Sequence, residues 1–89
     1  MTHVFYPALI FGPGQDGGYA VVVPGINVNG QGDSEADALL NAAVILQEVV
    51  DDLLRDGEAL PGPGDLREYD DFGDGKPAVM QAMLPAHAA

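Results

Sequence analysis

Two runs of aromatic and β-branched residues, separated by a glycine-rich break, open the chain. The first run spans residues 4–11 and the second residues 19–23, and Asp16-Gly17-Gly18 lies between them. Such runs are typical of β-strands, and a break of this kind is typical of a hairpin loop. The pattern predicts antiparallel strands over residues 3–11 and 19–23. Pro7 cannot donate to a ladder, so we expect it at an edge or a bulge.

A weaker third strand follows the hairpin. Pro24-Gly25 supplies the residues that suit the central positions of a type II turn. Over residues 26–31, polar side chains then alternate with apolar or small ones. This alternation predicts a half-exposed strand with one polar face, which completes a three-stranded antiparallel meander.

A long amphipathic helix is predicted over residues 35–55. Ser34 is a suitable N-cap, Asp37 stands three residues further on, and Gly57 can form a left-handed cap at the other end. Of the apolar positions we expect Leu39, Leu46, Val50 and Leu53 to be buried. Because the apolar face is wider than one small sheet needs, we expect a homodimer or a higher homo-oligomer. The apolar positions are Ala36, Leu39, Ala43, Leu46, Val50 and Leu53, widened by Leu40, Ala42, Ile45, Val49 and Leu54.

The last third of the chain changes in character. An acidic Pro/Gly-rich linker is expected over about residues 61–77, because Pro61-Gly62-Pro63-Gly64 disfavours regular structure. Residues 78–84 then form an apolar run that predicts a final strand. The expected fold is α+β: an antiparallel three-stranded meander, one long helix packed on it, and one further C-terminal strand. We expect a single domain over residues 1–89.

Charge narrows the range of partners. The 89 residues include 14 acidic and three basic residues, for a formal net charge of −11. Binding to nucleic acid depends on Lys and Arg, so we expect no direct contact with DNA or RNA, and the field of the chain favours basic partners. A simpler interpretation is that the acids only keep a small protein soluble. Without cysteine, a signal peptide or a membrane-spanning run, we expect a cytoplasmic protein that has no disulfide and no membrane contact.

Residues 12–17 match the GxGxxG string of dinucleotide-binding folds. That string binds a pyrophosphate only where its glycines open a helix, and here a strand is expected to follow. Asp70, Asp74 and Gly75 fit part of a calcium-binding loop, but the pattern lacks most of its other oxygen ligands. Both matches are better explained as loops.

Catalytic constellations are not evident either. A nuclease of the ribonuclease H type needs several carboxylates at strand ends, and the first three predicted strands contain no Asp or Glu. His3 and His87 stand near the two termini with no positioned nucleophile, and Ser34 is explained as a helix cap. We therefore expect a non-enzymatic protein that uses no metal and no cofactor.

An ordered set of residues over positions 4–63 resembles the HicB antitoxin family. The resemblance implies a partly degraded ribonuclease H-like domain that has lost its catalytic carboxylates. It also implies a partner, HicA, a small basic toxin that cleaves mRNA. Members of the family usually add a C-terminal DNA-binding domain, which is not expected within these 89 residues, and the segment after Pro24 is shorter than theirs and lacks their cysteine. The matching residues are Tyr6, Ala8, Asp16-Gly17-Gly18-Tyr19, Pro24, Gly32-Asp33-Ser34, Ala38, Asn41-Ala42, Gly57, Leu60-Pro61 and Pro63.

The resemblance and the acidity together predict an antitoxin that binds and neutralises a HicA-type ribonuclease. The alternative is an orphan oligomeric interaction module of the same fold with a different partner. Two acidic clusters are candidates for the contact, and a mobile acidic linker can adapt to a basic surface. The preferred candidates lie in the linker: Glu68, Tyr69, Asp70, Asp71, Phe72 and Asp74. The second cluster lies at the helix end: Glu48, Asp51, Asp52, Asp56 and Glu58.

Overall fold

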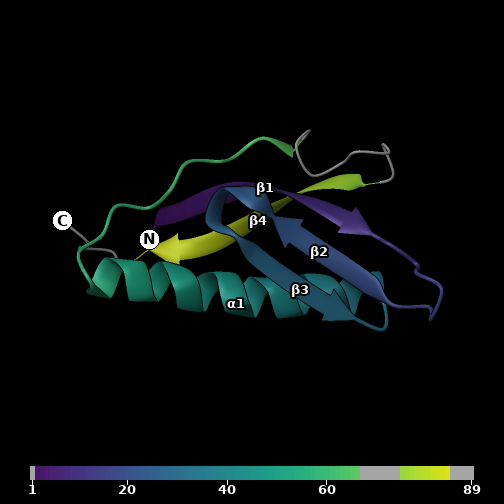
Figure 1. The fold of residues 1–89 in the computed structure, drawn as a ribbon. Coiled ribbons are helices and arrows are strands. Elements are labelled where there is room, and N and C mark those ends of the chain that lie inside the picture. The colour runs from purple at the N-terminus through teal and green to yellow at the C-terminus, as the bar shows by residue number, and fades with distance from the viewer. Residues whose placement is uncertain (1, 67–74, 85–89) are drawn as a thin grey trace.

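The computed structural model describes residues 2–66 and 75–84. Four strands form one antiparallel sheet in the order β3-β2-β1-β4, and a single long helix covers one face of it (Figure 1). This is the predicted α+β fold, and the further strand pairs with the first. The elements are β1 (Thr2–Phe11), β2 (Tyr19–Val23), the 3-10 helix η1 (Pro24–Ile26), β3 (Val28–Gly32), α1 (Glu35–Arg55) and β4 (Lys76–Leu84).

Helix α1 has the predicted bounds, and the capping residues explain both ends. The Ser34 hydroxyl accepts a hydrogen bond from the Asp37 backbone N–H at 3.1 Å, so one free donor of the first turn is satisfied. At the other end Gly57 has φ +74° and donates to the Leu54 carbonyl, while Glu58 N–H donates to Leu53. These paired bonds form a Schellman motif, which stops the helix.

The connection after β2 differs from the predicted type II turn. Residues 24–26 form a 3-10 turn, and Asn27 adopts a left-handed backbone with φ +58° and donates to the Pro24 carbonyl at 3.3 Å. An asparagine tolerates this conformation better than most residues. Strand β3 therefore begins at Val28, two residues later than expected.

Strand β1 is central at one end and an edge at the other. It pairs with β4 along Thr2–Ile10, but with β2 only from Leu9 to Phe11. Pro7 lies in the stretch that β2 does not reach, so the donor that proline lacks is not needed there. The expectation of a local edge at Pro7 is confirmed.

The core lies between the sheet and α1. Leu46 and Val50 are buried as predicted, whereas Leu39 and Leu53 are only partly buried. Three positions of the predicted apolar face (Ala36, Leu40 and Ile45) are exposed, because only one side of the helix meets the sheet. The buried core is Tyr6, Ala8, Ile10, Val21, Val23, Ile26, Val28, Ala38, Ala42, Leu46, Val50, Met80 and Ala82.

Glycines let α1 approach β3 closely. A Cβ atom on Gly30 would lie 2.5 Å from the backbone nitrogen of Ala42, and one on Gly32 would lie 2.6 Å from that of Ala38. Both distances are shorter than real Cβ atoms show. The backbone of the strand therefore rests directly on the small residues of the helix.

Two amide side chains of α1 bind the two outer strands. Asn41 Nδ2 donates to the Gln31 carbonyl of β3 at 2.6 Å. Gln47 Nε2 donates to the Met83 carbonyl of β4 at 2.9 Å, and Gln47 Oε1 accepts from the Met83 N–H at 2.8 Å. Each edge of the sheet is thus partly closed from the helix side.

The segment after α1 returns along the sheet (Figure 1). The Tyr6 hydroxyl donates to the Pro61 carbonyl at 2.8 Å, and burial raises the pKa of this tyrosine. Gly64, with φ +77°, lies against the η1 backbone, where its Cβ would be 2.6 Å from Gly25 N. The beginning of the predicted linker is therefore docked onto the domain, and β4 starts at Lys76, inside the range predicted for the linker.

Candidate partner-binding surface

The six partner-binding candidates of the linker lie in residues 67–74, outside the part of the chain that the structure describes. The predicted cluster at the helix end is described. Glu48, Asp51, Asp52, Asp56 and Glu58 are all exposed.

The side of α1 that points away from the sheet joins these acids to exposed apolar residues. Leu40 is 64% exposed, Val44 53% and Ile45 37%. Large apolar side chains with this exposure on one helix face are characteristic of a protein-interaction site when they are contiguous. We call Leu40, Val44, Ile45, Glu48, Asp51 and Asp52 the outer helix face.

Along the helix axis, the apolar residues of the outer helix face come before the acids. The apolar residues occupy positions 40–45 and the acids positions 48–52, so the whole face extends about 18 Å at 1.5 Å per residue. Sequence reasoning counted Leu40 and Ile45 in a wide apolar face without assigning them to the core, because such a stripe does not reveal which part of it meets the sheet. The acids that follow residue 47 on the same side of the helix were the signal that could have marked this side as exposed.

Few cations offset this surface in the described residues. Arg55 forms an exposed ion pair with Asp52 at 3.2 Å, one turn apart on the helix. Lys76 forms the other pair, with Glu35 at 3.0 Å, which ties the start of β4 to the start of α1. Glu48 and Asp51 are left as a negative patch beside the apolar residues. Asp51 also accepts from Gln47 Nε2 at 3.1 Å.

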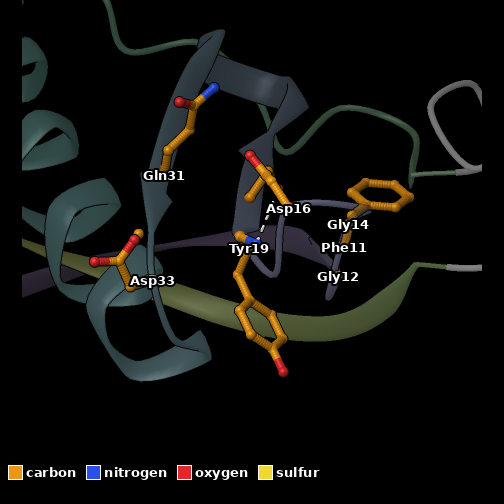
Figure 2. A pocket seen from close by; sticks show the side chains of 10 residues that line it. Phe11, Gly12, Gly14, Asp16, Tyr19, Gln31 and Asp33 are labelled. Atoms are coloured by element: carbon orange, nitrogen blue, oxygen red, sulfur yellow. Dashed lines mark hydrogen bonds between the residues drawn. The ribbon is translucent and has the colours of Figure 1, made fainter.

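A second candidate is an open pocket of about 500 Å³ at the β1–β2 hairpin (Figure 2). Asp16 is already engaged, because its Oδ1 accepts from Gly18 N–H at 3.0 Å within the loop. Figure 2 shows Phe11, Tyr19 and Asp33 pointing in different directions rather than toward one point. The pocket brings no acid and base together, and the glycines around it lead into β2 rather than into a helix, as expected.

The described residues hold no group of three or more side chains suited to a metal ion. Strands β1, β2 and β3 carry no carboxylate, as the sequence shows, so the described part of the sheet offers no ribonuclease H-type site. Within the same part of the chain, no helix is both long and apolar enough to cross a membrane.

The arrangement of the sheet and helix is that of the N-terminal domain of HicB antitoxins. That domain from Burkholderia pseudomallei matches with a TM-score of 0.74 at 21% identity, over 91% of this chain and 100% of the other. A chain of a toxin–antitoxin complex from Streptococcus pneumoniae matches with a TM-score of 0.74 at 24% identity, over 97% and 76%. A HicA3–HicB3 toxin–antitoxin complex gives 0.61 at 24% identity, over 91% and 100%.

Protein-family models and curated protein sequences gave no match. The structural matches confirm, at the level of the fold, the family resemblance found in the sequence. At these identities they establish the shared fold, and the role of the chain has to be argued from its own surface.

Proposed function

We propose that this protein is an antitoxin that binds a small basic ribonuclease of the HicA type and covers the surface with which that toxin binds RNA. The observation that carries the proposal is the outer helix face, where exposed leucine, valine and isoleucine adjoin Glu48, Asp51 and Asp52. The fold shared with HicB antitoxins, some of them in complexes with their toxins, supports it.

The chemistry of the surface fits such a partner. A ribonuclease needs a basic surface to bind the phosphates of RNA. Carboxylates on a rigid helix can bind the same Lys and Arg side chains in place of the phosphates. Charge complementarity of this kind mainly speeds association, while buried apolar side chains supply most of the affinity. Leu40 and Val44 therefore act as the anchors, and Glu48 and Asp51 steer the toxin onto them.

Surface plasmon resonance at several salt concentrations tests the proposal. The binding partner is the purified product of a neighbouring gene, where that product is short and Lys-rich. Val44→Lys places a cation against a basic partner, so we expect affinity to fall at least about tenfold. Glu48→Gln, Asp51→Asn and Asp52→Asn combined should slow association and flatten its salt dependence. Asn29→Lys, an exposed change on the opposite face of the sheet, serves as the control.

Two results separate the alternatives. If wild type and Asn29→Lys bind and Val44→Lys does not, the outer helix face is the contact. If Val44→Lys binds normally but neutralising Asp70, Asp71 and Asp74 slows association, the linker is the contact. Wild type that leaves the ribonuclease unbound and active would favour the alternative function, an interaction module of the same fold with a different partner.

A further inference from the structure

The open edge of β4 is a second surface, which adjoins the outer helix face at Gln47. Backbone groups along an antiparallel strand point alternately toward one neighbour and then the other. Because Met83 turns its N–H and C=O to Gln47, away from β1, the backbone groups of Pro77, Val79 and Gln81 point toward the same open side. Exposed strand edges of this kind can pair with another chain.

The two edges of the sheet differ in how well they are closed. Strand β3 is five residues long, and the helix binds its outward Gln31 carbonyl through Asn41. Strand β4 is nine residues long, and the Gln47 bonds close it only at Met83. Among residues 2–66 and 75–84, nothing closes the stretch centred on Val79, and the Val79 residue is 70% exposed.

We propose that a second copy of this chain pairs antiparallel with β4 across this edge, with the two Val79 residues opposite each other on a twofold axis. In this register each Val79 both donates to and accepts from its counterpart, and each Gln81 N–H donates to the Pro77 carbonyl of the other copy. The missing donor of Pro77 then falls at the ends of the ladder, and Met83 can keep its bonds to Gln47.

Neighbouring registers fit this edge less well. Moving the axis to residue 78 places Val79 opposite Pro77, so the Val79 carbonyl loses its donor. Moving it to residue 81 places Val79 opposite Met83, where pairing would require breaking the two bonds of Met83 to Gln47. Moving it to residue 80 pairs Val79 with Gln81 and makes as many bonds, but it places Pro77 of the other copy against the Gln47 side chain at Met83. The positions of Pro77 and Gln47 thus favour the register centred on Val79.

Charge favours a second copy over a basic partner at this edge. Strand β4 contains no acidic residue, and its one cation, Lys76, is paired with Glu35. A basic ribonuclease would find no carboxylate on this strand. Two copies of an acidic chain can approach here without opposing carboxylates on the paired strands.

Apolar side chains line the same edge on the sheet face opposite α1. Val79 and Met83 project there from β4, at 70% and 46% exposure, and Phe5 projects beside them from β1 at 59%. His3 lies against Phe5 on that face, with ring centroids 6.4 Å apart. Pairing of two copies would bring the two Val79 side chains together and shelter part of this apolar strip.

The test uses the full chain and light scattering over a range of concentrations. Wild type should be a dimer, and Val79→Lys should be a folded monomer, because the side chain is exposed. Its melting temperature should not depend on concentration, whereas that of the wild-type dimer should rise with concentration. Asn29→Lys, on the same sheet face but three strands away, should remain a dimer. An equimolar mixture of Val79→Lys and Val79→Glu should dimerise again, because opposite charges then meet at the axis.

Cross-linking tests the register independently. The chain has no cysteine, so a single Val79→Cys change introduces the only thiol. Cα atoms of a hydrogen-bonded antiparallel pair lie about 5.5 Å apart, within the range of a disulfide. Mild oxidation should therefore link Val79→Cys dimers and leave Val44→Cys mostly unlinked. A monomeric wild type at tens of micromolar, or a Val79→Lys variant that stays dimeric, would overturn the proposal whether or not a toxin binds.

Discussion

Gly30→Ala tests the contact on which the packing of α1 depends. The added Cβ would lie 2.5 Å from Ala42 N and 2.7 Å from both its Cα and its Cβ. Carbon atoms pack at about 3.5–4.0 Å, so the helix has to retreat by about 1 Å. Overpacking usually costs about 1–3 kcal/mol, and here the obstacle is helix backbone, which cannot change rotamer. We expect a loss of about 3 kcal/mol in the free energy of unfolding.

Such a loss is large for a domain of this size, whose whole stability is about 4–13 kcal/mol. It corresponds to a fall of about 12–24 °C in melting temperature, measured by circular dichroism. Gly62→Ala is the matched control, because a Cβ there meets nothing within 4 Å, and it should change the melting temperature little. If Gly30→Ala, like the control, melted within about 2 °C of wild type, which is roughly the precision of the assay, β3 and α1 would not touch as described.

Three further predictions concern the core, the docked segment after α1, and charge. Leu46→Ala should cost about 2–5 kcal/mol in urea unfolding because Leu46 is fully buried, whereas Leu40→Ala, at an exposed site of the same helix, should change stability by less than about 0.5 kcal/mol. Tyr6→Phe removes the bond to Pro61 and should cost about 0.5–1.5 kcal/mol at neutral pH. Because burial raises the pKa of Tyr6, the folded state favours the protonated phenol more than the unfolded state does. Wild type should therefore lose stability as the pH rises above about 10, and Tyr6→Phe should lose less stability over the same range. Filter binding at about 150 mM salt should retain no DNA or RNA duplex.

Local signals in the sequence were sufficient for the elements themselves. Ser34, Asp37 and Gly57 each act within a few residues of the helix ends, so the bounds of α1 could be predicted from them. The alternation after Pro24 likewise identified which side of β3 faces the helix. The prediction of a type II turn was wrong because the left-handed backbone conformation occurs at Asn27 rather than at Gly25. Asparagine and glycine both tolerate this conformation.

Contacts between distant residues could not be predicted in the same way. Gln47 meets Met83 across 36 residues, and an exposed glutamine on a helix carries no mark of that partner. The Gly30–Ala42 contact left a weak trace, since small residues occur at alternate positions of the strand and at four-residue spacing on the helix. Because burial depends on the position of the sheet, the sequence could not tell which part of the wide apolar face is exposed, and the predicted burial of Leu39 and Leu53 is only partial. The acids of the candidate surface could therefore be named from the sequence, whereas the exposed apolar residues beside them could be recognised only from the fold.

We expect the outer helix face and the β4 edge to be used at the same time, although they meet at Gln47, which bonds both Asp51 and Met83. The outer helix face lies along α1 on the side away from the sheet, and β4 is an outer strand of that sheet (Figure 1). Val79 projects from β4 on the sheet face opposite the helix. A dimer formed through β4 would present two outer helix faces, so we expect two chains of antitoxin to bind two molecules of ribonuclease. Native mass spectrometry should find a 2:2 complex for wild type and a 1:1 complex for Val79→Lys. A 2:1 complex of antitoxin and ribonuclease would show that pairing hides one toxin site, and the two surfaces would then have to overlap.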